Sequence, residues 1–264
     1  MPQQFQNRNV TDCEKTTMPV EFITICVIAF IAGVLTTAYF CYSMGFGMKM
    51  PGGWTMSMMW MRMPGQTWFT SMLCYMLMWL AMMVAMMMLP ALPTFLKTRR
   101  KWTSHCYMAT GYFAIWLIAG IAIYPVGVWL AKMEMKSEPI SRAVPLLSGA
   151  ILIVAGAIQF TRWKRKHLLG CRSQFGCAAA CPEHEKSFRL GCEQGATCFA
   201  CCAAPMTILL VLGIMNPLAM ILITIVITAE KLLPRPEITA RVVGSAAIVA
   251  GIIMTIHWAS LTSA

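Results

Sequence analysis

Long apolar segments separated by short charged or Pro/Gly-rich breaks follow one another along almost the whole chain. Each is close to the roughly 20 residues that a helix needs to cross the hydrocarbon core of a bilayer. The pattern predicts seven spanning helices, at Val20–Tyr42, Thr67–Leu89, His105–Ala131, Ser141–Trp163, Cys192–Gly213, Pro217–Leu233 and Ile238–Ala259. Only the short sequence IMNP joins the fifth to the sixth. These two could form one hairpin, and six spans is the alternative count.

The predicted fold class is therefore all-α, a polytopic transmembrane helical bundle in a single integral membrane domain, 1–264. Composition agrees, because 58% of the residues are hydrophobic and only 12% are charged, against roughly 25% charged in soluble domains. Between the spans we expect a polar N-terminal tail (1–19), a Met-rich loop (44–66) and a Cys-rich loop (164–191).

The distribution of Lys and Arg predicts the orientation of the bundle. With the N-terminus in the cytoplasm, 16 of the 21 basic residues fall on the cytoplasmic side and five on the outer side, as the positive-inside rule requires. The tail and the Cys-rich loop are then cytoplasmic, and the Met-rich loop is outer. The net charge of +11 reflects this topology and helix-end contacts with lipid headgroups, so no nucleic-acid partner is expected.

Methionine is concentrated in the outer loop and in the helix that follows it. Sixteen of the 25 methionines lie within 44–88. Thioethers fill gaps in apolar cores, but they also bind soft ions, Cu(I) above all. In the loop we expect a short helix at Met56–Met63 that Thr55 caps and that lies in the membrane interface. Met56, Met59 and Met63 would share one face of it.

The second predicted span continues the methionine pattern. Met82 and Met86, like Met83 and Met87, are four residues apart, so each pair stacks on one helix face. Pro90 and Pro93 are expected to end or bend this helix at its cytoplasmic side. Such a stripe is typical of core packing, and metal binding is the alternative.

Cysteines form a second group of soft donors. Seven of the twelve lie between 171 and 202. Cys198, Cys201 and Cys202 are spaced for one face of the fifth span. The assumed topology places them at the depth of the methionine stripe, so the two groups could share one ion. Thiolate donors suit Cu(I), zinc or iron–sulfur clusters, and zinc remains the alternative to copper.

The cytoplasmic loop carries further cysteines at spacings that match neither a zinc ribbon nor a ferredoxin pattern. Cys177, Cys181 and His184 could still share a helix face and hold an ion of their own. The loop also contains Cys171, and Cys192 directly follows it. The five cysteines before residue 171 are interpreted as small apolar side chains. They are Cys13, Cys26, Cys41, Cys74 and Cys106.

Several motifs together resemble a bacterial family of predicted metal-binding integral membrane proteins whose function is uncharacterised. The motifs are MWLAMMVAMMMLP, the Gly170–Cys171–Ser173–Phe175 element, the CxxCC group and EKLLPR at 230–235. The resemblance covers about 44–259 and implies a multi-pass protein of the bacterial inner membrane. It implies the following metal-binding positions: Met82, Met83, Met86, Met87, Cys171, Cys198, Cys201 and Cys202. The chain departs from the pattern at Ala203, where an aromatic residue is usual, and in its additional cysteines.

The sequence favours binding and transfer over catalysis. No phosphate-binding loop or GxSxG element is present, and no last-helix lysine could hold retinal. Glu230 is the one carboxylate expected within a span, and we expect it to pair with Lys231. We therefore predict a copper-handling membrane protein that is not an enzyme.

We expect the Cu(I) ligands to be the outer methionines and the intramembrane Met/Cys group, for transfer or transport across the membrane. The alternative is an accessory subunit of a larger membrane complex, such as a copper-dependent oxidase or monooxygenase. Expected partners are the lipid bilayer and metal-carrying thiol or thioether proteins of the cytosol or periplasm.

Overall fold

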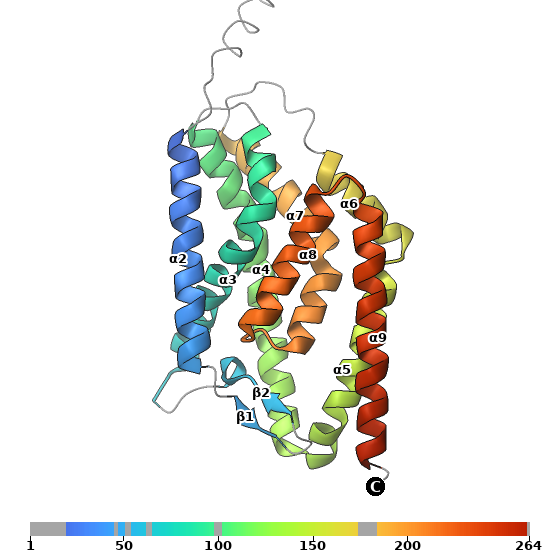
Figure 1. The fold of residues 1–264 in the computed structure, drawn as a ribbon. Helices are drawn as coiled ribbons and strands as arrows, with labels where there is room; N and C mark the ends of the chain where they lie inside the picture. Colours follow the sequence, from blue (N-terminus) through green and yellow to red (C-terminus); the bar gives the residue numbers. More distant parts are fainter. Residues whose placement is uncertain are drawn as a thin grey trace, which may run out of the picture.

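The computed structural model describes residues 20–44, 47–50, 54–61, 65–97, 102–173 and 184–262. Within these ranges the chain forms eight α-helices, one 3-10 helix and one short hairpin (Figure 1). The elements are α2 (Val20–Met44), β1 (Met48–Lys49), β2 (Thr55–Met56), η1 (Met58–Trp60), α3 (Trp68–Lys97), α4 (Trp102–Lys136), α5 (Glu138–Ile158), α6 (Arg162–Ser173), α7 (His184–Leu212), α8 (Pro217–Leu232) and α9 (Pro236–Thr262).

The fold is a helical membrane bundle, as the apolar pattern predicts. Six helices are long and apolar enough to cross a bilayer, namely α2, α3, α4, α5, α7 and α9. The seventh predicted span is α8, whose 16 residues extend about 24 Å, less than the hydrocarbon thickness of about 30 Å. A turn in which Gly213 takes a φ of 99° joins α7 to α8. The alternative of a hairpin with six full spans therefore describes the structure better.

The two ends of the bundle carry different structures (Figure 1). Helix α6 lies at one end, called here the α6 end, and the β1–β2 hairpin lies at the other, called the hairpin end. Helix α2 starts at the α6 end and α9 finishes at the hairpin end. The turn between α7 and α8 lies on the side of the bundle that carries the hairpin.

Two predicted boundaries are wrong. Helix α3 does not end at its prolines but continues through Pro90 and Pro93 to Lys97, since neighbouring helices can compensate for the backbone groups that proline frees. The predicted span Ser141–Trp163 instead breaks after Ile158. Thr161 accepts a hydrogen bond from the Lys164 amide (3.2 Å) and thereby caps the new helix α6. Helix α6 and the start of α7 occupy much of the segment 164–191 that was expected to be loop.

The Met-rich segment also differs from the prediction. Residues Thr55–Met56 pair with Met48–Lys49 as antiparallel strands, so no helix starts at Thr55. Ser57 instead caps the 3-10 helix Met58–Trp60 through the Met59 amide. The strand pairing satisfies backbone groups in a segment rich in Gly and Pro, where a continuous helix would be costly. Met63 lies outside the described residues.

Glycines bring helix pairs into backbone contact, as is common within membranes. Helices α5 and α9 meet at two reciprocal pairs, Gly149 with Gly251 and Gly156 with Gly244. A methyl group at Gly251 would lie 2.7 Å from the Gly149 carbonyl oxygen. Helices α4 and α7 are also close, because a methyl group at Gly195 would lie 2.8 Å from the Tyr112 carbonyl oxygen. This second contact fixes how α4 faces the cysteines of α7.

We expect Gly251→Ala to lower the free energy of unfolding by about 1–3 kcal/mol, the usual cost of forcing extra atoms into a packed interface. Unfolding in mixed detergent micelles measures it. Gly170→Ala in α6 is the control, because its nearest neighbour would be Thr197 Cγ2 at 3.7 Å, an ordinary contact. Equal stabilities of the two variants would contradict the tight α5–α9 contact.

Candidate metal centre

Four buried cysteines meet where α6 packs against α7. Cys198, Cys201 and Cys202 lie on one face of α7 and are at most 1% exposed, and α6 contributes Cys171 at 6%. The i, i+3, i+4 spacing places the first three side chains together, as the sequence predicts. The family resemblance implies Cys171 as well, and the fold brings it to the other three, because the helix break after Ile158 turns α6 back onto α7.

The sulfur atoms of these residues, called here the thiol cluster, are near one another. Cys198 Sγ and Cys202 Sγ are 3.9 Å apart, and the Cys171 thiol lies within hydrogen-bonding reach of Cys198 and Cys201. These contacts, together with burial, raise the pKa of Cys171 in α6. Two sulfurs bound to one tetrahedral metal at about 2.3 Å each would be about 3.8 Å apart. The Cys198–Cys202 separation therefore already fits a shared metal.

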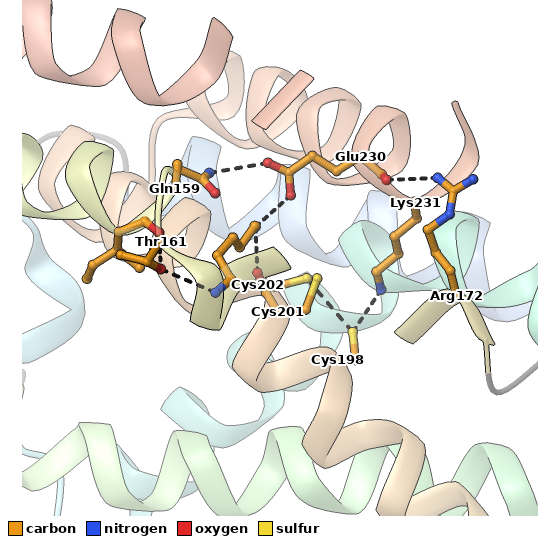
Figure 2. A network of polar contacts seen from close by, with 10 residues as sticks. Gln159, Thr161, Arg172, Cys198, Cys201, Cys202, Glu230 and Lys231 are labelled. Atoms are coloured by element: carbon orange, nitrogen blue, oxygen red, sulfur yellow. Dashed lines mark hydrogen bonds and ion pairs between the residues drawn. The ribbon is translucent and has the colours of Figure 1, made fainter. Parts of the chain in front are cut away.

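Cys198 has two further polar neighbours from other helices (Figure 2 shows the lysine). Lys231 Nζ of α8 donates to Cys198 Sγ at 2.8 Å, and the Tyr112 hydroxyl of α4 lies 2.9 Å from the same sulfur. The expected pairing of Lys231 with Glu230 is wrong. Adjacent residues of a helix point in different directions, so the two side chains of α8 reach different partners.

Glu230 instead pairs with Lys164 of α6 at 2.7 Å, and both side chains are at most 2% exposed. The carboxylate also accepts a hydrogen bond from Gln159 Nε2 (3.2 Å), while Lys164 Nζ donates to the carbonyl oxygen of Cys201 (2.7 Å). Figure 2 shows this network beside the thiol cluster. It joins α6, α7 and α8 at the level of the cysteines.

The buried charges around the thiol cluster do not balance by themselves. Lys164 and Lys231 supply two cations, and Glu230 supplies one carboxylate. An unpaired buried charge is costly, so the remaining positive charge favours a thiolate near Lys231. Cys198 is best placed to be that thiolate, since its sulfur directly accepts a hydrogen bond from Lys231 Nζ.

Sequence reasoning missed Tyr112, Lys164 and Lys231 as members of this site. Both lysines were counted among the basic residues at helix ends, yet they are only 1% and 6% exposed. One signal in the sequence could have found the two lysines. They border apolar segments, as Glu230 does, and charged side chains at membrane depth pair with one another. No spacing rule could pair Lys164 with a carboxylate 66 residues away.

The predicted methionines of α3 lie in the same buried core as the thiol cluster. Met82, Met83, Met86 and Met87 are at most 2% exposed and belong to one connected cluster with the four cysteines. Helix α3 packs against α4 and α8, which also carry Tyr112 and Lys231. The stripe is thus next to the helices that surround the thiols.

The predicted methionines of the Met-rich segment are divided between two clusters. Met56 is 2% exposed and packs with Met50 and Ala131 in a separate small cluster. Met59 is 7% exposed and belongs to the main core cluster. The described part of the segment therefore packs onto protein and is not a helix lying in the interface.

The donors gathered in the core are soft, although they do not form a finished coordination sphere. In the part of the chain that the structure describes, no three His, Cys, Asp or Glu side chains are already arranged to hold a metal ion. The proposed loop ligands Cys177 and Cys181 lie outside the described residues, as does the side chain of His184. Thiols and thioethers select Cu(I) over hard ions such as magnesium or calcium.

The fold and this site define a class: multi-pass helical membrane proteins with a sulfur-rich interior. The PpoB2 copper chaperone family model matches residues 76–254, and the chain belongs to this family. No curated protein and no solved structure matches the chain. The family supports copper handling and so agrees with the metal-related resemblance, but it gives no support for zinc. The match includes the α3 methionines and the thiol cluster and begins after the Met-rich segment.

Proposed function

We propose that this protein is a membrane-embedded copper chaperone whose cargo, Cu(I), binds at the thiol cluster. Cys198 and Cys202 are the central ligands, with Cys201 and Cys171 beside them. The α3 methionines provide a soft, weakly polar surround. The protein itself catalyses no reaction, and the ion is handed on without a change of oxidation state.

The observation that carries this proposal is the buried thiol cluster with its own counter-ion. Cu(I) held by two thiolates has a net charge of minus one, which is costly to bury unpaired. Lys231 lies 2.8 Å from Cys198 and would neutralise that complex. Small rotations of the other thiols would complete the ligand set, since no preformed set is present among the described side chains.

We propose that the cargo travels from the hairpin end to the α6 end. The hairpin end presents thioethers, which suit the capture of Cu(I) outside the cytoplasm. The α6 end, where basic residues predominate, would face the cytoplasm of a bacterial cell and exchange copper with carrier thiols. The second candidate function is delivery of Cu(I) to a larger copper-dependent membrane enzyme, because a chaperone passes its cargo to an acceptor protein.

Elemental analysis of the reduced, detergent-purified protein tests the proposal directly. After loading with Cu(I) and removal of loosely bound metal, the wild type is expected to retain copper. The triple variant Cys198→Ala, Cys201→Ala, Cys202→Ala is expected to lose most of it, since the central ligands are gone.

The matched control replaces cysteines outside the thiol cluster, Cys41→Ala with Cys74→Ala, both of which are only partly buried. This control should retain wild-type copper. Copper bound equally by the wild type and the triple variant would overturn the proposed site. If the protein co-purifies in fixed stoichiometry with a larger membrane complex, that complex is the acceptor and delivery to a membrane enzyme is favoured.

A further inference from the structure

A cavity lies at the hairpin end, away from the thiol cluster. Its volume is about 580 Å³, and it lies between β2, the first half of α5, the turn joining α7 to α8, and α9. The cavity lies between the α7–α8 turn and the hairpin strand β2. We attribute it to the short length of α8. The Met-rich segment covers this space at the end of the bundle.

Three methionines from separate parts of the chain line this cavity. Met56 comes from β2, Met215 from the α7–α8 turn and Met254 from α9. Met56 is 2% exposed, whereas the other two are half-buried and pack against the main core. The sequence gives no hint that these three methionines share a cavity, because their positions are far apart along the chain.

The chemistry of the lining is selective. Among the described lining residues there is no carboxylate, imidazole, thiol, lysine or arginine. The Asn216 side-chain oxygen already accepts hydrogen bonds from the amides of Leu218 and Ala219. The strongest remaining metal donors are the thioethers, which bind soft ions and discriminate against hard ones. A neutral site also suits a monovalent ion better than a divalent one.

The wall formed by the Met-rich segment is held in place by specific contacts. Trp54 Nε1 donates to the carbonyl oxygen of Ser141 at the start of α5 (3.0 Å). The Met50 amide donates to the Trp54 carbonyl oxygen (2.9 Å). Trp60 packs against Tyr75, with ring centroids 5.6 Å apart. Met56 is therefore positioned by the fold.

We infer that Met56, Met215 and Met254 form a thioether site that receives Cu(I) at the hairpin end before the ion reaches the thiol cluster. Met215 lies in the turn that joins the cysteine helix α7 to the lysine helix α8. Met206 follows Cys202 by one turn of α7 and lies between the two sites along that helix. This inference rests on the proposed function and locates where the cargo is taken up.

Silver(I) is the probe, because it is a soft monovalent ion that, unlike Cu(I), is not oxidised in air, so it can be added without a reductant. Silver bound per chain is measured by elemental analysis on the full-length protein in detergent. The site variant is Met56→Leu, Met215→Leu, Met254→Leu. The control is Met72→Leu, Met133→Leu, Met135→Leu, which removes three methionines that do not line the cavity.

We expect the site variant to bind one silver ion fewer per chain than the control, and to load the thiol cluster more slowly when the cysteines are followed by alkylation. Equal silver binding and equal loading rates in the two variants would overturn the inference. If the triple variant does not fold, Met215→Leu with Met254→Leu replaces it, since both residues are only half-buried.

A third protein separates this inference from the proposed function. The Cys198→Ala, Cys201→Ala, Cys202→Ala variant should keep the silver ion at the hairpin end and lose the one at the thiol cluster. Wild-type silver binding by that cysteine variant, with a loss in the methionine variant, would reject the thiol cluster and leave the thioether site standing.

Discussion

Replacing Lys164 with Met is expected to lower the free energy of unfolding by about 3–5 kcal/mol, because it leaves the Glu230 carboxylate buried without its cation. The Lys164–Glu230 pair is at most 2% exposed and has a 2.7 Å contact, so water cannot compensate for the loss. The substitution also removes the hydrogen bond to the Cys201 carbonyl oxygen. Unfolding of the purified protein in mixed micelles measures the effect.

The double variant Lys164→Met with Glu230→Met should recover most of this loss, since removing both charges of a buried pair is often neutral or even stabilising. Arg189→Ala is the control for an exposed pair. Arg189 and Glu193 form a 3.1 Å contact with side chains 81% and 54% exposed, and its loss should cost no more than about 0.5 kcal/mol. A Lys164→Met variant as stable as the wild type would show that the pair is not buried.

Replacing Lys231 with Met is expected to weaken Cu(I) binding by about 10- to 100-fold, the usual effect of removing a partner that supports a metal ligand. The lysine neutralises the thiolate of Cys198 at 2.8 Å and would neutralise the copper–thiolate complex as well. Competition with a chromophoric Cu(I) chelator of known affinity measures the change.

Lys231→Arg retains the positive charge and should recover part of the affinity. Lys166→Met removes an exposed lysine of α6 and should leave the affinity unchanged, which controls for the net charge of the protein. The charge argument is wrong if Lys231→Met binds Cu(I) as tightly as the wild type while the triple cysteine variant does not bind.

The apolar pattern predicted most of the fold because each spanning helix satisfies its own backbone hydrogen bonds. The predicted ranges Val20–Tyr42 and Ile238–Ala259 each lie within the observed helices α2 and α9, and Pro217–Leu233 extends one residue beyond α8. The errors occurred where local signals compete with context. Pro90 and Pro93 did not stop α3, and Thr55 begins a strand and not a helix.

The sequence also determined part of the candidate site, namely the grouping of Cys198, Cys201 and Cys202. Their spacing alone places them on one face of whatever helix carries them. The stripe that contains Met82, Met83, Met86 and Met87 follows from the same periodicity. These features are local, since they depend on 3.6 residues per turn and on no other part of the chain.

Tertiary structure alone decided which groups surround the thiols. Lys231 and Glu230 are neighbours in sequence, yet one reaches Cys198 and the other reaches Lys164. Met56, Met215 and Met254 line one cavity for the same reason. These contacts join side chains from different helices, and the packing of those helices, including the glycine contacts, sets their geometry. A single sequence records the periodicity of each helix but not the distances between helices.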